Sequence, residues 1–185
     1  MKLNLGAGTD IRPEYVNHDI AKLPGIEVCF NLNTYPWPWE DNSFEEIVAN
    51  DLIEHLDDFL LAMNEIHRIL SLGGVISLTV PYWNSCYRYI DPTHKYGFHE
   101  DTFKFFDPTS HYCQDRHYYT SARFSIEKEL FLIAPFIPYF WIPGMKEIKI
   151  KNSFAKRIIG FIGNIFLSNL ILGLQMEMRK LKSSL

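Results

Sequence analysis

The sequence predicts an α/β fold built on a mainly parallel β-sheet. Residues 2–5 form a short strand that leads into a glycine turn, in the stretch LNLGAG. Residues 75–82, VISLTVPY, are a near-continuous apolar run, which is typical of a strand buried on both faces. Strand-like segments alternate with loops and one clear helix between these two points, as in a parallel sheet with crossover connections. The length of 185 residues suits one domain, so we expect a single domain over residues 1–185.

The elements of the first half follow in order. After residues 2–5, further strands are expected at 15–20, 26–32 and 45–50. Residues 57–70 predict a helix, because one apolar stripe at helical spacing contains Phe59, Met63, Ile66 and Leu70. Asp57 and Asp58 suit its N-terminus, and Gly73-Gly74 is expected to end it.

The second half is more irregular. Polar and aromatic loops on the substrate side are expected over residues 83–121, with a short helix at 100–106. Strands at 124–133 and 175–182 would lie antiparallel at the sheet edge. Residues 152–174, which carry no charge from 158 onward, predict an apolar helical insertion or lid.

Composition and charge narrow the class of protein. The fractions of 47% hydrophobic and 22% charged residues are typical of a soluble globular domain. Three scattered cysteines and the absence of a charged-then-apolar leader indicate a reducing, cytoplasmic setting. Residues 1–145 carry 10 Lys and Arg against 20 Asp and Glu, whereas residues 146–185 carry 8 against 2. The acidic body argues against general nucleic-acid binding.

The basic C-terminal part leaves three interpretations open. Its uncharged stretch of 17 residues, 158–174, is marginal for a membrane span, but the flanking Lys and Arg residues suit an anionic membrane surface. Residues 151–182 could therefore make a peripheral membrane contact. The same helix could instead cover the active site as a lid, or form the face of a homodimer.

The glycine turn does not fit a phosphate-binding loop. A dinucleotide fingerprint needs a third glycine where Ile11 stands, and Pro13 shortens the crossover that follows. Asp19, at the end of the second strand, follows Gly8 by 11 residues rather than the roughly 20 of that fingerprint. No Gly-Lys-Ser/Thr follows either. What remains is a tight turn and an acid placed for the hydroxyls of a ribose, which indicates a nucleoside cofactor without phosphates.

Five motifs in this order resemble the class I S-adenosylmethionine-dependent methyltransferases, and in particular compact members of the methyltransferase type 11-like kind. They are LNLGAG, VNHDI, FNLN, WPWEDNSFEEIVANDLIEHL and NEIHRILSLGGVISLTVP. The resemblance implies a Rossmann-like methyltransferase fold, with a seven-stranded, mainly parallel sheet in the order 3-2-1-4-5-7-6 and helices on both faces. It also implies that S-adenosylmethionine is held by Asn4, Gly6, Ala7, Gly8, Asp19, Ile20, Asn31, Leu32 and Asn50.

The stretch NDLIEHL raises the question of a metal. On a helical turn after the fourth strand, Asp51, Glu54 and His55 would share one face at the carboxyl ends of the strands. This resembles the Glu-x-x-Glu-His motif of the small-RNA 2′-O-methyltransferases and the ubiquinone-biosynthesis O-methyltransferases, with His94, or less favourably His99, as a further ligand. Mg²⁺ or Mn²⁺ would suit the four-residue set Asp51, Glu54, His55 and His94. Alternatively, the Glu-His pair only caps and packs, and His94 or His55, with Asp51 nearby, serves the chemistry as a general base.

The expected function is therefore transfer of a methyl group to a hydroxyl of a small molecule, a sugar or a lipid-linked glycan, with or without a metal. The alternative is a non-catalytic binding protein that keeps the methyltransferase fold and associates with a membrane surface.

Overall fold

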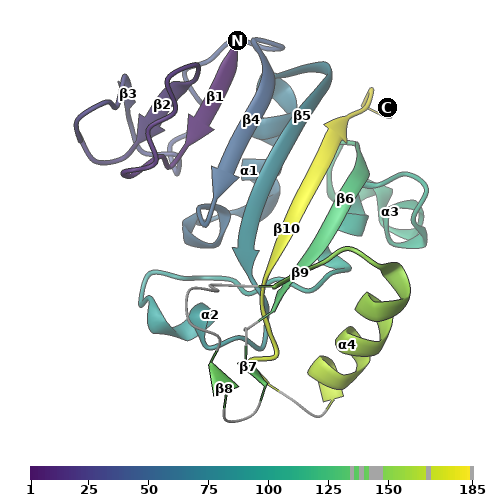
Figure 1. The fold of residues 1–185 in the computed structure, drawn as a ribbon. Coiled ribbons are helices and arrows are strands. Elements are labelled where there is room, and N and C mark those ends of the chain that lie inside the picture. The colour runs from purple at the N-terminus through teal and green to yellow at the C-terminus, as the bar shows by residue number, and fades with distance from the viewer. Residues whose placement is uncertain (134–135, 138–139, 142–147, 166–167, 184–185) are drawn as a thin grey trace.

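One eight-stranded mixed sheet organises the molecule (Figure 1). The computed structural model describes residues 1–133, 136–137, 140–141, 148–165 and 168–183. The strands of this sheet are β1 (Lys2–Leu5), β2 (Val16–Asp19), β3 (Val28–Cys29), β4 (Phe44–Asn50), β5 (Leu70–Pro81), β6 (Phe124–Ile133), β9 (Ile148–Ile150) and β10 (Ile171–Lys180). A separate two-stranded sheet consists of β7 (Phe136–Ile137) and β8 (Phe140–Trp141). The helices are η1 (Ile53–His55), α1 (Phe59–Ile69), α2 (Tyr87–Ile90), η2 (Thr102–Phe106), α3 (His111–Asp115), η3 (His117–Tyr119) and α4 (Ser153–Ile165).

The strand order confirms the predicted methyltransferase topology. The order in the sheet is β3-β2-β1-β4-β5-β10-β6-β9. Because β10 is the seventh of the expected strands and β6 the sixth, the first seven positions follow 3-2-1-4-5-7-6. The pairs β2–β3, β1–β2, β1–β4 and β4–β5 are parallel, whereas β10 pairs antiparallel with both β5 and β6. The sheet departs from the expected seven strands by one, because β9 adds an antiparallel strand beside β6.

The connections are shorter than the resemblance implies. The segments 6–15, 20–27 and 30–43, which join the first four strands, contain no helix. One face of the sheet packs against α1 and η2 around an apolar core that includes Phe44, Phe98, Phe103, Phe106 and Phe124. Polar side chains alternate onto the other face along β5 and β10, and they remain partly exposed: Ser77, Thr79, Gln175, Glu177 and Arg179. This part of the sheet is therefore solvated on one face rather than covered by helices on both.

Helix α1 begins close to the predicted point but ends earlier. The Asp58 side chain caps it by accepting a hydrogen bond of 2.9 Å from the Leu61 amide. The helix ends at Ile69, and β5 begins at the next residue, so the prediction that Gly73-Gly74 ends the helix is wrong. These glycines lie inside β5 instead, where its pairing with β4 shifts register. A side chain at Gly74 would lie 2.8 Å from the Ser71 carbonyl oxygen, so the close approach of the backbone requires a glycine there.

Two other predicted boundaries are corrected. The third strand spans two residues rather than 26–32, and the helix of the C-terminal insertion covers 153–165 rather than the whole of 152–174. Residues 171–174 belong to β10, where long-range pairing with β5 and β6 recruits them into the sheet. None of the helices in the described ranges has the length and apolar character that a membrane span requires.

Candidate functional site

The candidate site lies where the parallel strands end. Because β1, β2, β4 and β5 run in one direction, their carboxyl ends meet at one edge of the sheet (Figure 1). Ligands of open α/β sheets bind at this edge. The glycine turn follows β1, Asp19 ends β2, and Asn50 and Asp51 stand at the end of β4. The fold therefore brings the predicted cofactor and acceptor residues to the same edge.

The glycine turn after β1 requires two left-handed residues. Gly6 has φ +62° and Gly8 has φ +50°, a region that side chains strongly disfavour. A Cβ on Gly6 would lie 2.8 Å from the Leu52 Cδ1 atom, whereas a Cβ on Gly8 would meet no atom of the described residues within 4 Å. Gly6 thus allows the turn to pack against the segment after β4, and Gly8 leaves the backbone bare toward open space. That bare backbone fits a nucleoside cofactor lying against the turn.

Asp19 is held rigidly beside this turn. Its Oδ2 atom accepts a 2.8 Å hydrogen bond from the Gly8 amide, and its Oδ1 atom accepts one of 2.9 Å from the Ala21 amide. Each carboxylate oxygen keeps a further lone pair, so ribose hydroxyls could still donate to it. The next residue, Ile20, is 66% exposed and offers apolar surface next to the carboxylate. These features fit the residues to a ribose and an attached base.

Some of the other predicted cofactor residues are buried and support the loop, whereas others are exposed to solvent. Asn4 is buried, and its amide donates to the Asp10 carbonyl at 2.7 Å and to the Asn17 side chain at 3.1 Å. It therefore holds the loop after β1 from inside the protein. Ala7 and Leu32 are also buried, whereas Asn31 and Asn50 are exposed. The Asn31 Oδ1 atom accepts a hydrogen bond of 3.0 Å from the Asn33 amide, which fixes the orientation of its amide.

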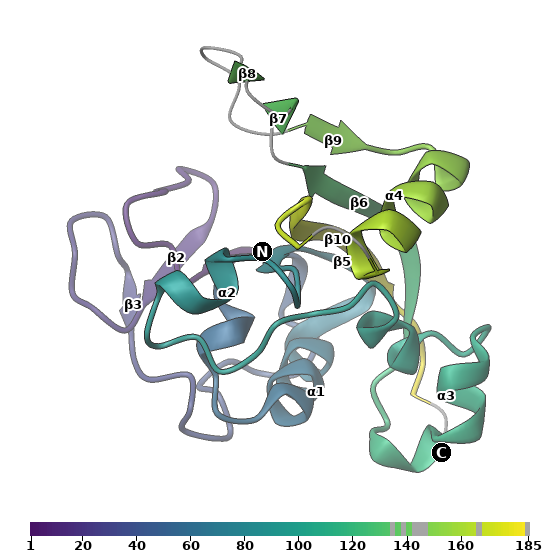
Figure 2. The ribbon, with the colours of Figure 1, turned by 90° about the horizontal axis from the view of Figure 1, so that it is seen from below.

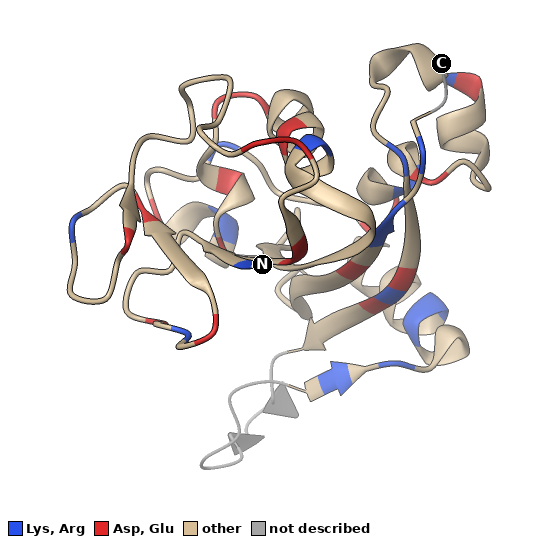
Figure 3. Ribbon diagram, turned by 90° about the horizontal axis from the view of Figure 1, so that it is seen from above, with Lys and Arg blue, Asp and Glu red and all other residues tan. Residues whose placement is uncertain are grey.

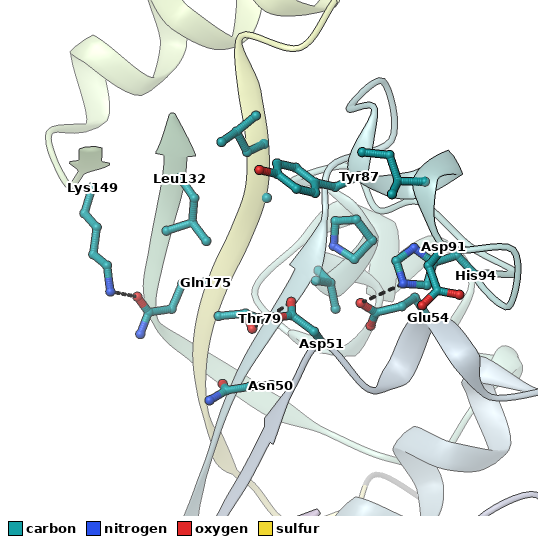
Figure 4. A pocket seen from close by; sticks show the side chains of 15 residues that line it. Asn50, Asp51, Glu54, Thr79, Tyr87, Asp91, His94, Leu132, Lys149 and Gln175 are labelled. Carbon is teal, nitrogen blue, oxygen red and sulfur yellow. Dashed lines mark hydrogen bonds and ion pairs between the residues drawn. The ribbon is translucent and has the colours of Figure 1, made fainter. Parts of the chain in front are cut away.

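A pocket of about 630 Å³ adjoins the ends of β4 and β5 (Figure 4). Three of the residues predicted for the acceptor line it, namely Asp51, Glu54 and His94. The remaining lining residues come from β4, β5, β6, β9 and β10, and from α2 with the residue that follows it: Asn50, Thr79, Val80, Pro81, Tyr87, Ile90, Asp91, Leu132, Lys149, Leu172, Gly173 and Gln175. The pocket thus combines hydrogen-bonding groups with apolar walls, which is the usual composition of a small-ligand site.

Glu54 is the most unusual residue of this pocket. Its side chain is fully buried, and neither carboxylate oxygen has a hydrogen-bond partner among the described residues. Burial raises the pKa of this carboxyl to about 8, because the charged form loses its hydration. The nearest base is His94, whose Nε2 atom lies 3.9 Å from Glu54 Oε1 (Figure 4). The His94 Nδ1 atom is likewise buried without a hydrogen-bond partner in the described part of the chain.

His55 stands next to this pair in a fixed tautomer. The hydroxyl of Thr93 donates to Asp91 at 2.6 Å, so it accepts from the Nδ1 atom of His55 at 2.8 Å. The proton then resides on Nδ1, and Nε2 keeps a free lone pair. Burial lowers the pKa of His55, as does the neighbouring charge of His94 when protonated, whose ring centroid lies 4.6 Å from that of His55. His55 is therefore presented as a neutral ligand or base.

Glu54, His55 and His94 together form a possible metal centre. One donor atom from each lies within 4.8 Å of the other two. Asp51 does not belong to this group, although we expected it to share a helical face with Glu54 and His55. It lies outside η1 at φ +48°, and its carboxylate accepts a hydrogen bond of 3.0 Å from the Thr79 hydroxyl. His99, the less favoured ligand, contacts the amide of Asn164 at 3.3 Å instead.

Sequence reasoning missed the residues that support the cluster. Thr93 and Asp91, which orient His55, stand in the stretch DPTH, and the Asp-x-Thr spacing is a signal for a local side-chain turn. Thr79 interrupts the apolar run of β5 with a hydroxyl near its carboxyl end, which is also a readable signal. Lys149 and Gln175, joined at 3.0 Å across β9 and β10, come from strands far apart in the sequence, and no local pattern predicts their meeting.

Comparisons with known proteins agree with this geometry. Residues 4–78, from β1 into β5, match a family model described as a methyltransferase domain. No curated protein matches the chain significantly.

Several solved structures share the fold. An S-adenosylmethionine-dependent methyltransferase from Archaeoglobus fulgidus is 18% identical with a TM-score of 0.60, covering 97% of this chain and 85% of its own. A possible histamine N-methyltransferase from Thermotoga maritima is 14% identical with a TM-score of 0.60, covering 97% and 82%. The YcgJ protein from Bacillus subtilis is 15% identical with a TM-score of 0.58, covering 99% and 92%. At these identities, the similarity demonstrates the fold.

Proposed function

We propose that this chain, whose residues 4–78 match a methyltransferase domain and whose fold is shared with S-adenosylmethionine-dependent methyltransferases, transfers a methyl group from S-adenosylmethionine to a hydroxyl group with the help of a divalent cation. The acceptor would be a small molecule, a sugar or a lipid-linked glycan. One observation carries the proposal: the Glu54 carboxylate is fully buried, neither of its oxygens has a hydrogen bond among the described residues, and it faces His94 in the pocket.

The residues around the glycine turn fit the cofactor. Asp19 would accept hydrogen bonds from the ribose hydroxyls, Gly8 would lie against the nucleoside, and Ile20 would contact the base. S-adenosylmethionine supplies a methyl group that is bound to a positively charged sulfur. An oxygen nucleophile attacks the methyl carbon in line with the carbon–sulfur bond, and the sulfur is displaced. The chain's task is then to align the acceptor oxygen with that methyl group and to remove its proton.

Glu54, His55 and His94 would hold the cation. A buried carboxylate without partners is costly, and a bound cation would remove that cost by neutralising its charge. Two imidazoles and one carboxylate make a donor set that suits Mn²⁺ or Fe²⁺ better than Mg²⁺, which prefers oxygen ligands. A cation there would lower the pKa of an acceptor hydroxyl, so that the hydroxyl reacts more readily.

The rest of the pocket suits a polar acceptor. Asp51, Thr79 and Gln175 provide acceptor and donor groups that match a molecule with several hydroxyls. Ile90, Leu132 and Leu172 provide apolar walls beside them, so a ring or an attached chain could pack there. These features support a hydroxylated acceptor with an apolar part.

Calorimetric titration tests both halves of the proposal. The protein should bind S-adenosylmethionine with or without EDTA, and it should bind Mn²⁺ with one site per chain. His55→Gln and His94→Gln should each weaken Mn²⁺ binding by about tenfold or more while leaving cofactor affinity unchanged. His111→Gln, an exposed position on α3, is the matched control.

Methyl transfer then decides the role of the cation. With a panel of hydroxylated acceptors, transfer from labelled S-adenosylmethionine should stop in EDTA and return with Mn²⁺. Transfer that persists in EDTA but disappears in His94→Gln would reject the cation and leave His94 as a general base. Failure to bind S-adenosylmethionine at millimolar concentration would overturn the proposal altogether.

A further inference from the structure

Helix α4 packs in an unusual orientation. Its buried residues are Gly160 and Gly163, which lie against Phe131 and Ile171 of the sheet. Of its large apolar side chains, Ile159 packs against the core, whereas four others form an exposed stripe at helical spacing: Phe154 72%, Ile158 44%, Phe161 59% and Ile165 60%. An ordinary surface helix turns its apolar stripe toward the core. In α4 the two glycines and Ile159 face the protein, and the stripe from Phe154 to Ile165 faces outward.

The charges beside this stripe have one sign. Lys149, Lys151, Lys156 and Arg157 lie between Ile148 and Ile165, a stretch without Asp or Glu. In Figure 3 this segment carries blue positions and no red ones, in contrast to the acidic residues spread over the rest of the molecule. Lys151 and Arg157 are exposed, whereas Lys156 is bound to Glu129 at 2.8 Å. The apolar stripe is thus flanked by cationic groups.

The same helix is tied to the wall of the acceptor pocket. The Asn84 amide donates to the Gly163 carbonyl at 2.7 Å, and the Asn169 side chain, just after α4, accepts from the Cys86 amide. Cys86 directly precedes α2, in which Tyr87 and Ile90 line the pocket and are 51% and 68% exposed. Figures 1 and 2 place α2 and α4 at the end of the molecule toward which β4 and β5 point. Exposed apolar side chains therefore lie both on α4 and on α2 at the pocket, and Asn84 and Asn169 connect the two segments.

We propose that α4 lies on an anionic lipid membrane surface, with its apolar stripe in the interface and its basic residues at the headgroups. An interfacial helix needs this combination of an apolar face and flanking Lys or Arg. Resting on the proposed function, the inference extends to the substrate class: the pocket would receive a hydroxylated acceptor carried by that membrane.

The charges favour a membrane over a second copy of the chain. In a twofold dimer through this face, the same surface patch would meet itself, so the basic groups of the two copies would approach each other. An anionic lipid surface instead provides the opposite charge. The acidic body of the protein would be repelled from that surface, which leaves the α4 end as the contact.

Flotation with lipid vesicles tests the proposal on the full chain. The protein should float with vesicles of phosphatidylcholine and phosphatidylserine, and less with phosphatidylcholine alone. The double variant Phe154→Ser/Ile165→Ser should weaken binding to the anionic vesicles by at least about tenfold. Arg157→Glu should weaken it on anionic vesicles only. The matched control is Tyr118→Ser/Leu72→Ser, because Tyr118 and Leu72 are 72% and 58% exposed and lie on other elements.

The outcomes separate this proposal from the function. All variants should bind S-adenosylmethionine as the wild type does, so loss of cofactor binding would contradict the function and not the membrane contact. The proposal is overturned if the wild type stays with the unfloated protein, if it binds both vesicle types equally, or if the double variant floats unchanged. Sedimentation showing a dimer that the double variant dissociates, without vesicle binding, would assign the surface to a second copy.

Discussion

The cofactor turn and the acceptor pocket lie at the same edge of the sheet, but they differ in how far their polar side chains are hydrogen-bonded within the protein. Around the turn, two side chains predicted for the cofactor are hydrogen-bonded within the protein: Asn4 donates to Asp10 and Asn17, and Asp19 accepts from the Gly8 and Ala21 amides. In the pocket, Glu54 has two buried oxygens without hydrogen bonds in the described part of the chain, and His94 has one such nitrogen. The turn is therefore preorganised, whereas the pocket depends on what it binds.

This difference has an energetic meaning. A hydrogen-bonded loop keeps its shape whether or not a ligand is present, so the cofactor needs little reorganisation to bind. A buried carboxylate without partners destabilises the protein by itself and stabilises it only when a proton or a cation is present. The following changes should affect stability and ligand binding differently in the two regions.

Glu54→Gln should have the largest effect, because it removes the charge at nearly constant shape. We expect methyl transfer to fall by about 100-fold or more, since the cation would lose its only carboxylate ligand. Binding of S-adenosylmethionine should not change. Labelled methyl transfer and calorimetry measure the two quantities. If the variant keeps wild-type transfer in the presence of Mn²⁺, Glu54 is not part of the chemistry.

The same variant should alter how stability depends on pH. The folded carboxyl keeps its proton up to a pH near 8, whereas an unfolded one releases it near 4.5. Unfolding therefore releases a proton between these values, and the metal-free protein should become less stable as the pH rises through this window. The slope from this group is at most roughly 1.4 kcal/mol per pH unit. Urea unfolding across the window should show a shallower fall for Glu54→Gln, and equal slopes would contradict the burial of an unbonded carboxyl.

Some of these features could be predicted from the sequence, and others could not. The strand order and the 124–133 strand were predictable, because the motifs and the local apolar patterns determine them. The burial of Glu54 was not, since the chain turns at Asp51 into a left-handed conformation that no residue pattern indicates. The start of β10 at Ile171 likewise depends on pairing with β5 and β6, which are distant in sequence. Local signals thus predicted the strands better than the conformation of the chain around Glu54.

Asp19→Ala probes the preorganised region. It removes the acceptor for the ribose hydroxyls, and hydrogen bonds to a charged group contribute about 1.5–3 kcal/mol each. We therefore expect the affinity for S-adenosylmethionine to fall by about tenfold to 100-fold, with Mn²⁺ binding unchanged. Asp19→Asn is the conservative control, because its carbonyl oxygen can still accept from the Gly8 amide. Calorimetry that shows equal cofactor affinity in wild type and Asp19→Ala would remove the ribose role.

Gly6→Ala should mainly reduce stability. The substitution forces a side chain to φ +62° and places its Cβ 2.8 Å from Leu52 Cδ1. Left-handed strain and the displacement of Leu52 together should cost about 2 kcal/mol in the free energy of unfolding. Leu52→Ala combined with Gly6→Ala should recover part of this loss relative to the sum of the single variants, because it removes the clash. Strictly additive losses in urea unfolding would show that Leu52 does not limit the turn.

Gly8→Ala is the smallest change and the sharpest comparison with Gly6. A Cβ at Gly8 meets no atom within 4 Å in the described part of the chain, so its cost in stability should be limited to the strain at φ +50°, about 1 kcal/mol. The added methyl would instead project toward the place where the cofactor is proposed to lie, so affinity for S-adenosylmethionine should fall more than stability does. For both glycine variants, thermal unfolding measures the loss of stability and calorimetry measures the loss of affinity for S-adenosylmethionine. Cofactor affinity that survives Gly8→Ala but not Gly6→Ala would mean that the nucleoside lies elsewhere on this edge, because only Gly8 leaves the turn open to a ligand.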